Sequence, residues 1–310
     1  IEAIEAARKA GLSVRGATAY VTLEPCSHQG RTPPCAKRLI AEGISRVVFA
    51  VRDPNPLVCG RGEAMLRDAG IDVTSGVCEA EARQAHAGFF SCVTRRRPWV
   101  RLKSAVSLDG RTALENGISQ WITGSKARED AHRYRALSQG ILTGIGTVLA
   151  DNPRLNVRLE GEHPNPTKYI IDPRAQTPVT AAVLTGAKTV LFVSEVALPD
   201  KIAALKSAGA EVLTMPTDRE GHFDLRQILE AIAAQGVNDL LLEAGARLSG
   251  AFLQACLVDE LLVYMAPALI GPGKPLADLA AKTRMDQVAR WQFVSVTPVG
   301  EDVRLILRAI

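Results

Sequence analysis

The sequence predicts an α/β protein with two domains, the first over residues 1–95 and the second over residues 98–310. Short β-branched apolar runs alternate with helix-forming segments through both parts, a pattern typical of parallel sheets covered by helices. A chain of 310 residues is long enough to bury two cores, and its 47% hydrophobic and 23% charged residues are typical of globular proteins. The expected boundary is Arg95-Arg96-Arg97-Pro98, because this segment is charged, ends in proline and has no periodicity.

The first part of the chain predicts three strands and three helices in alternation. Strands are expected over residues 17–23, 46–51 and 71–74, and helices over 35–43, 63–69 and 79–93. Pro34 before the first of these helices and Gly43 at its end are residues that favour a helix start and a helix stop. The turn-rich Asp53-Pro54-Asn55-Pro56 follows the second strand, at the kind of strand end where ligands of open α/β sheets collect.

The second part predicts a larger and mostly parallel sheet. Strands are expected over residues 99–106, 141–143, 168–171, 189–193, 211–213 and 239–242, and helices over 125–139, 199–208 and 225–235. The tail adds strands over residues 260–266, 293–297 and 303–307. Because no long helices separate these last strands, we expect them to form antiparallel pairs at one edge of the sheet.

Composition and charge argue against several classes of partner. A net charge of +4 is mild, the Lys and Arg residues are scattered, and aromatic residues are few, so a nucleic-acid partner is not expected. No apolar run is long enough to cross a bilayer, so no membrane partner is expected either. The six cysteines are not spaced as a disulfide framework, which favours reduced thiols and a cytoplasmic location.

Two of the cysteines, Cys26 and Cys35, flank the predicted passage from the first strand to the first helix. A helix N-terminus stabilises thiolate, and thiolate pairs are what zinc sites use. The spacing alone leaves buried free thiols as an alternative, and a disulfide is disfavoured because nothing indicates an oxidising compartment.

The whole string Glu24-Pro25-Cys26-Ser27-His28-Gln29-Gly30-Arg31-Thr32-Pro33-Pro34-Cys35 resembles the zinc half-motif of the riboflavin-pathway pyrimidine deaminases, a branch of the cytidine-deaminase-like family. The resemblance implies a three-layer fold, zinc held by Cys26, Cys35 and a histidine, and a glutamate that moves protons. No histidine precedes Cys26, and residues 1–11 look like the helix that follows the family's His-Ala-Glu. The resemblance therefore places the missing ligand and glutamate upstream of Ile1, so we expect the start of this domain to be missing.

The same resemblance implies substrate contacts in the cysteine loop. We expect His28 and Arg31 to meet the base and the phosphate of the substrate. For His28, a role in ordering the loop is a nearly equal alternative.

Two glycine-bearing turns in the second part point to a nucleotide. Gly144-Ile145-Gly146-Thr147 and Glu243-Ala244-Gly245-Ala246 each follow a buried strand, and the second opens a helix. Glycine lets a ligand approach the backbone, and helix N-termini offer unpaired N–H groups to phosphate. Each turn alone is more often structural, but two in one domain favour a nucleotide site.

These turns belong to a second resemblance. Residues 102–103, 107–110, 119–123, 147–153 and 243–245 look like the pyrimidine reductase of riboflavin synthesis. The resemblance implies a dihydrofolate-reductase-like α/β fold and NADPH as the cofactor. The order deaminase-then-reductase is that of the bifunctional bacterial family.

Carried over by position, this resemblance implies two sets of contacts. The NADPH contacts are Ala105, Trp121, Thr147, Asp151, Gly245, Ala246, Arg247, Leu248, Ser249, Gly250 and Ala251. The substrate contacts are Ser119, Arg135, Leu155, Arg158 and Glu243. Arg135 and Arg158 carry paired donors suited to a phosphate. Lys103 is a further substrate candidate, because it is charged within an apolar strand.

The resulting expectation is a riboflavin-pathway enzyme with zinc and NADPH. It hydrolytically deaminates 2,5-diamino-6-(5-phosphoribosylamino)pyrimidin-4-one and then reduces the ribosyl chain to ribityl. We also expect a homo-oligomer, formed by edge strands of the tail. A reductase with an inactive deaminase-like scaffold is the alternative, and an editing deaminase of nucleic acids is disfavoured because the stacking aromatics it needs are few.

Overall fold

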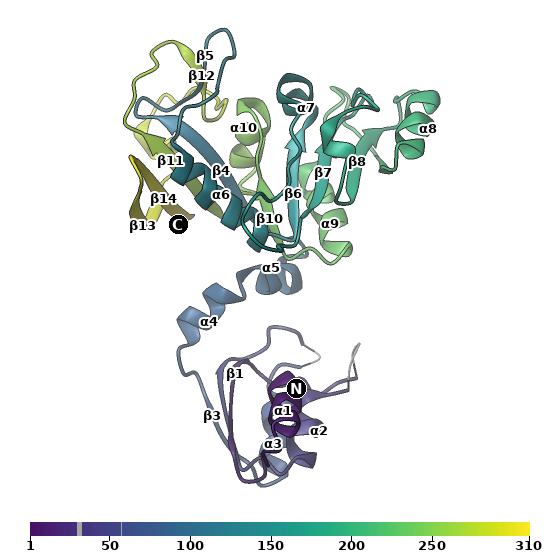
Figure 1. The fold of residues 1–310 in the computed structure, drawn as a ribbon, viewed down its shortest axis with the longest axis vertical. Coiled ribbons are helices and arrows are strands. Elements are labelled where there is room, and N and C mark those ends of the chain that lie inside the picture. The colour runs from purple at the N-terminus through teal and green to yellow at the C-terminus, as the bar shows by residue number, and fades with distance from the viewer. Residues whose placement is uncertain (30–32, 57) are drawn as a thin grey trace. The chain divides into compact units, whose positions relative to one another are not determined.

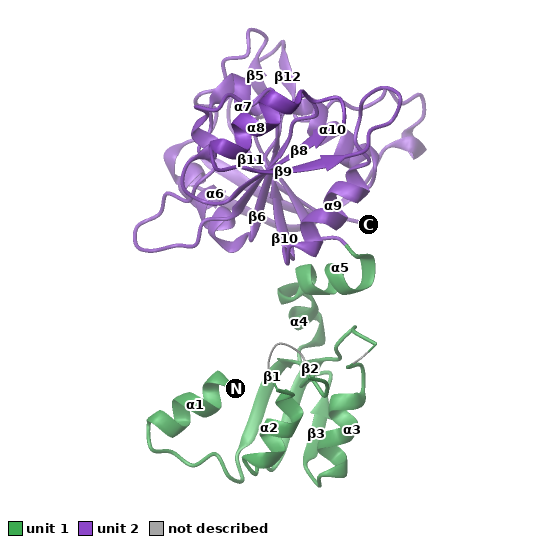
Figure 2. Cartoon of the chain, turned by 90° about the vertical axis from the view of Figure 1, so that its right-hand side faces the viewer, with its two compact units in different colours: residues 1–96 green, residues 97–310 purple. Residues whose placement is uncertain are grey.

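The structure is a computed structural model that describes residues 1–29, 33–56 and 58–310 (Figure 1). The chain divides into two compact units, residues 1–96 and residues 97–310, called unit 1 and unit 2 below (Figure 2). The division falls within the charged Arg95–Pro98 segment. Both units contain parallel strands joined by helices, so the predicted α/β class is confirmed.

Unit 1 contains a three-stranded parallel sheet in the order β1-β2-β3. Its strands are β1 (Thr18–Leu23), β2 (Arg46–Val51) and β3 (Asp72–Ser75), and its first helices are α1 (Glu2–Lys9), α2 (Cys35–Ala41) and α3 (Arg61–Asp68). These helices pack on one face of the sheet, where Ile4, Leu39 and Leu66 surround Phe49. Apolar side chains on both faces of β2 explain why almost the whole strand is buried.

The other face of β2 is covered by α4 (Glu79–Ala85) and α5 (Ala87–Arg95), through Ala82 and Phe90. The prediction of one helix over residues 79–93 is therefore wrong. The chain turns at His86, whose Nε2 lies 2.8 Å from the Thr22 hydroxyl of β1. Helical periodicity continues across this position in the sequence, and only the contact with β1 marks the break.

Unit 2 contains a nine-stranded sheet in the order β13-β14-β11-β4-β10-β6-β7-β8-β9. The parallel strands are β4 (Trp99–Ser107), β6 (Gly140–Gly144), β7 (Thr167–Ile171), β8 (Thr189–Ser194), β9 (Glu211–Met215), β10 (Asp239–Leu242) and β11 (Glu260–Ala266). At one edge, β14 (Asp302–Ala309) pairs antiparallel with both β11 and β13 (Trp291–Val299). The predicted antiparallel edge is thus confirmed.

Helices cover both faces of this sheet. The first face carries α6 (Ser125–Leu137), α7 (Ile145–Asp151) and α8 (Pro199–Ser207), and the second carries α9 (Leu225–Ala234) and α10 (Ala246–Gln254). Short 3-10 helices span Ala182–Leu184 and Met285–Gln287. A separate antiparallel pair, β5 (Arg111–Leu114) with β12 (Gly273–Pro275), was not expected from the sequence. None of the helices in the described part of the chain is long and apolar enough to span a membrane.

The topology of unit 2 places several strand ends together. β10 lies between β4 and β6, although it follows them in the sequence by roughly a hundred residues, and β11 lies on the other side of β4. The carboxyl ends of these parallel strands therefore lie together at one end of the sheet. The order of the strands along the chain reverses at this point. Ligands of open α/β sheets bind at such positions.

Candidate functional site

The two predicted thiols of unit 1 lie side by side. Cys26 follows β1, and Cys35 is the first residue of α2. The Cys35 backbone N–H donates to Cys26 Sγ over 3.2 Å, and the Ala36 N–H donates to the Cys26 carbonyl over 3.1 Å. Burial, followed by hydrogen bonding and charge interaction with Cys26, raises the pKa of Cys35.

The donor chemistry of this pair suits part of a zinc site. Zinc binds thiolates well, but a catalytic site uses three protein ligands and one open position. In residues 1–29, 33–56 and 58–310, no group of three His, Cys, Asp or Glu side chains is placed to hold a metal ion. The described residues therefore bring two thiols together, fewer than the three protein ligands of a catalytic zinc site.

A buried carboxylate next to the thiols was missed by the sequence analysis. Glu24 is 2% exposed, and its two oxygens accept N–H groups from Asp53, Gly60, Gly62 and Glu63 at 3.0–3.4 Å. The available signal was a charged residue at the end of an apolar strand. It did not show that the partners come from a segment roughly thirty to forty residues away.

His28 lies in the same loop and is half-buried, with its Nδ1 shielded and without a hydrogen-bond partner among the described residues. Asp53 interacts electrostatically with His28 and is itself buried, and this burial raises the pKa of Asp53. Arg31, the other predicted substrate contact, lies outside the described residues.

Glu243 forms the centre of the predicted site in unit 2. It follows β10, one position beyond the register pairs that Leu242 makes with Leu102 and Leu142. This register places Glu243 beside Lys103 of β4, whose Nζ lies 3.8 Å from Glu243 Oε2. Thr143 of β6 is the neighbour on the other side, and its buried hydroxyl has no partner among the described residues.

Arg135 of α6 holds the Glu243 carboxylate with two hydrogen bonds, from Nε over 2.7 Å and from Nη2 over 2.9 Å. Its Nη1 donates to the Asn156 carbonyl over 3.0 Å. Arg158 contacts the Asn156 side chain, and its backbone N–H donates to His132 Nδ1 over 3.3 Å. The structure thus brings four predicted residues together: Lys103, Arg135, Arg158 and Glu243. We call these four, with His132, the Glu243 cluster.

The charge state of the Glu243 cluster favours an anion. Burial acts to raise the pKa of Glu243, but the charges of Arg135 and Lys103 outweigh it and lower this pKa to about 2. Burial and the neighbouring Arg135 and Arg158 lower the pKa of His132 to about 4. At neutral pH the cluster therefore holds three cations, one carboxylate and a neutral imidazole, a net positive charge suited to a phosphate.

The two glycine turns lie against each other. A Cβ atom on Gly144 would lie 3.3 Å from Leu248 Cδ2, so the end of β6 adjoins the first turns of α10. Gly245 and Arg247 are exposed at the start of α10, and Ala246 and Leu248 are half-buried. Ser249 and Gly250 are buried. Ser249 Oγ donates to the Ala244 carbonyl, and a Cβ on Gly250 would lie 2.0 Å from the Asp278 carbonyl oxygen.

The remaining predicted contacts are distributed over the same unit. Ala105 is in β4, Thr147 and Asp151 are in α7, Leu155 is buried after α7, and Ser119 and Trp121 precede α6. Trp121 is 67% exposed, and the Arg128 guanidinium lies over its ring at 4.3 Å from the centroid. Its described contact is therefore with α6 rather than with the Glu243 cluster.

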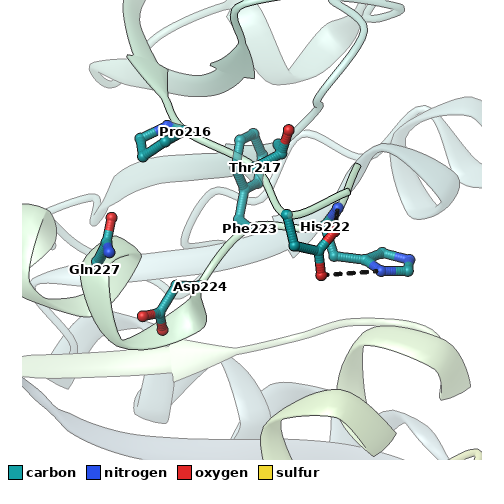
Figure 3. Close-up of a pocket in the computed structure, with 7 residues that line it drawn as sticks. Pro216, Thr217, His222, Phe223, Asp224 and Gln227 are labelled. Atoms are coloured by element: carbon teal, nitrogen blue, oxygen red, sulfur yellow. Dashed lines mark hydrogen bonds and ion pairs between the residues drawn. The ribbon is translucent and has the colours of Figure 1, made fainter. Parts of the chain in front are cut away.

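One described cavity lies elsewhere in unit 2, with a volume of about 280 Å³. It follows the edge strand β9 and is lined by Pro216, Thr217, Asp218, His222, Phe223, Asp224 and Gln227 (Figure 3). His222 Nδ1 lies 3.8 Å from Asp218 Oδ2. None of the predicted site residues lines this cavity.

Comparison with known families and proteins agrees with this division. Residues 98–305 match the family described as RibD C-terminal domain, and residues 1–51 match the cytidine and deoxycytidylate deaminase zinc-binding region. The chain is 42% identical over 309 residues to the riboflavin biosynthesis protein RibD of Bacillus amyloliquefaciens, covering 97% of this chain and 82% of that protein. It is 41% identical over 318 residues to RibD of Escherichia coli K12, covering 98% and 85%.

Solved structures are similar over the same range. Acinetobacter baumannii RibD superposes with a TM-score of 0.88 at 40% identity, covering 98% of this chain and 84% of that one. A diaminohydroxyphosphoribosylaminopyrimidine deaminase/5-amino-6-(5-phosphoribosylamino)uracil reductase from Thermotoga maritima gives a TM-score of 0.85 at 33% identity, covering 99% and 83%.

Proposed function

Because this chain belongs to the RibD family of riboflavin biosynthesis proteins, we propose that it carries two catalytic centres, one in each unit. Unit 1 deaminates 2,5-diamino-6-(5-phosphoribosylamino)pyrimidin-4-one, and unit 2 reduces the ribosyl chain of the deaminated product to ribityl. Two observations made on the same chain carry this proposal. Unit 1 has two adjacent thiols, and unit 2 has a cluster of cations around Glu243.

In unit 1, Cys26 and Cys35 would hold a zinc ion together with a ligand from outside the described residues. When bound, zinc supplies a water molecule of lowered pKa to hydrolytic chemistry. The chain's own contribution is to fix the two thiols through the N–H groups of Cys35 and Ala36. His28, with an unpartnered buried ring nitrogen among the described residues, is suited to hold the pyrimidine or to order the loop around it. Arg31 retains its expected phosphate role as part of the proposal.

In unit 2, NADPH would lie along the two adjoining glycine turns, and it supplies the hydride. The start of α10, from Gly245 to Arg247, offers N–H groups to a diphosphate. The other proposed cofactor contacts are Ala105, Trp121, Thr147, Asp151 and residues 248–251. Ser249 and Gly250 are buried, so we propose that they fix the position of α10 beside the cofactor and do not contact it through a side chain.

The substrate would bind over the Glu243 cluster. Arg158 is suited to its phosphate, because the described hydrogen bond of its guanidinium is to a neighbour in its own segment. Arg135 uses three of its five N–H groups on Glu243 and Asn156, so we assign it mainly to orienting the Glu243 carboxylate. Lys103 and Glu243 would then face the ribosyl chain, with Ser119 and Leu155 as further proposed contacts.

We further propose that the protein is a cytoplasmic homo-oligomer. β13 is an edge strand with Phe293, Val294 and Val296 exposed, and such an edge pairs readily with a second copy. Light scattering should give a mass above that of one chain, and a Phe293→Lys variant should shift it towards the monomer. A wild-type mass equal to one chain would remove this part of the proposal.

The test of function uses purified protein and the diaminopyrimidinone substrate. We expect ammonia release without NADPH, and NADPH oxidation once deaminated product is present. Replacing Cys35 with Ser should remove bound zinc and ammonia release while leaving reduction of supplied deaminated substrate, and Cys59→Ser should change neither. Zinc retained at full stoichiometry in the Cys35 variant would refute the metal assignment.

A reductase-only function is the second candidate. The observation that favours it is the absence of a third metal-ligating side chain beside the thiols in the described residues. NADPH oxidation without any ammonia release would select it.

A further inference from the structure

We propose that Glu24 is a positioning residue of the deaminase centre, which fixes residue 53 and residues 60–63 to the thiol-bearing loop. This inference rests on the proposed deaminase function of unit 1. It concerns a side chain that would touch neither metal nor substrate and would act through the backbone of two neighbouring segments.

The contacts of the Glu24 carboxylate use both of its oxygens. Oε1 accepts the N–H groups of Gly62 over 3.0 Å and Glu63 over 3.1 Å. Oε2 accepts those of Gly60 over 3.0 Å and Asp53 over 3.4 Å. A carboxylate on a residue that is 2% exposed would be costly without such partners, so the four donors explain how it is tolerated.

The origin of the four donors gives the carboxylate its role. Asp53 follows β2, whereas Gly60, Gly62 and Glu63 form the start of α3. Glu24 itself follows β1, directly before the Pro25-Cys26 step. One side chain therefore joins the carboxyl ends of two parallel strands to a helix N-terminus, whose N–H groups and dipole favour a negative charge.

A second contact holds the same segments together independently of charge. A Cβ atom on Gly62 would lie 1.9 Å from the Pro25 carbonyl oxygen, so the backbone of the thiol loop rests directly on the first turn of α3. Any larger residue at position 62 must separate the two. The position of Cys26 is thus set by α2 on one side and by α3 on the other.

The consequence for the site is a fixed spacing between the thiols and the 53–56 turn. The Asp53 N–H donates to Glu24, two residues before Cys26, so the same carboxylate ties this turn to the loop that carries the thiols. If Glu24 lost one pair of donors, the 53–56 turn would no longer be held at a fixed distance from the two thiols. Substrate binding should then weaken more than the chemical step.

The test compares Glu24→Gln with Glu79→Gln in the purified protein. The amide introduced at position 24 can accept only one pair of N–H groups and directs its own N–H groups at the other pair. Glu79 of unit 1 is exposed, and its described ion pair is with Arg83 of its own helix, which makes it a control that leaves these segments unchanged.

We expect Glu24→Gln to raise the deaminase KM by about tenfold, the effect of leaving one buried donor unsatisfied, with a much smaller change in kcat. Hydrogen exchange without substrate should accelerate at the donor pair that loses its acceptor, either Gly60 with Asp53 or Gly62 with Glu63, but not in β2. Glu79→Gln should leave both measurements at wild-type values. A Gly62→Ala variant, which separates the segments without altering charge, should reproduce the KM effect even if Glu24→Gln fails to fold.

Unchanged KM and unchanged amide exchange in Glu24→Gln would overturn the proposal, as would a loss of thermal stability with KM at the wild-type value in both variants. These outcomes differ from a failure of the proposed function. In that case the wild-type protein itself would release no ammonia, while the exchange difference at Gly60 or Gly62 would still show that Glu24 holds this segment.

Discussion

The Glu243 carboxylate shows how much one residue contributes to unit 2. It is held by Arg135 and approached by Lys103, and both cations come from elements far away in the sequence. Because the pair is largely buried, removing either partner leaves a charge without compensation. Glu243 and Arg135 therefore act as a unit, and the proposed phosphate contact falls to Arg158.

The first prediction concerns the pH dependence of stability. The pKa of Glu243 is about 2 in the folded protein and its ordinary value is 4.5, so its contribution to stability is present above pH 4.5 and is lost as the pH falls towards 2. The shift corresponds to up to about 3 kcal/mol. Urea unfolding at pH 6 and pH 3 should show that Glu243→Gln is destabilising at pH 6 and less than half as destabilising at pH 3. A difference from wild type that stays constant across this window would contradict the prediction, and the exposed Glu162→Gln is the control.

The second prediction separates the two arginines. Arg158→Ala should raise the KM of the phosphorylated reductase substrate roughly ten- to hundredfold, because a charged hydrogen-bond partner of the phosphate is lost. A dephosphorylated substrate should bind Arg158→Ala and wild type equally. Steady-state kinetics with both substrates measures this, with Arg133→Ala as the matched control on the exposed side of α6. An equal KM increase for both substrates would show that Arg158 does not meet the phosphate.

For single residues, the sequence indicated which side chains belong to the sites, but it did not indicate which of them contact one another. Cys26 with Cys35, and Arg158 with Glu243, were selected from motifs, and the structure brings each set together. The ion pair of Arg135 and the four donors of Glu24 were not predictable, because both depend on contacts between segments that local patterns do not connect.

Among the elements of unit 2, α10 packs especially closely against a neighbouring backbone. Its N-terminal half carries the proposed cofactor turn, and its Gly250 lies against the backbone of Asp278. The helix can therefore approach this segment only where a residue lacks a side chain.

The third prediction tests this approach. Gly250→Ala should destabilise the protein by more than about 1 kcal/mol, because the new Cβ meets backbone that cannot rotate away. The NADPH dissociation constant should rise as α10 shifts. Gly146→Ala, where a Cβ meets nothing within 4 Å, should not destabilise. Thermal unfolding and fluorescence titration with NADPH measure both effects, and wild-type values for Gly250→Ala would show that the segment can move.

The accuracy of the element predictions follows from burial. β2, β10 and β11 have the predicted bounds, because their apolar runs are buried and end at turn residues. β5 and β12 were missed because they are short, partly exposed and lack alternation. The break at His86 was missed because apolar periodicity on one side of a helix continues through it.

For the whole molecule, the two units have separate cores, one around Phe49 and the other around the large sheet. The fourth prediction follows from this separation. A fragment that begins at Arg97 should fold and retain NADPH-dependent reduction of deaminated substrate, because every residue proposed for that site belongs to unit 2. Circular dichroism and NADPH oxidation test it. A folded but inactive fragment would show that the reductase site needs unit 1.

The place of β10 in the large sheet has a consequence for how the protein is made. During synthesis β4 and β6 leave the ribosome early, but β10, which pairs with both of them, is synthesised much later. Trp99 of β4, for example, lies opposite Asp239 of β10. Until then, two apolar strand edges stay open in the nascent polypeptide, and such edges invite aggregation. Once residue 242 has left the exit tunnel, β10 can join β4 to β6 and create the Glu243 cluster, and β11 and β14 are then added on the other side of β4.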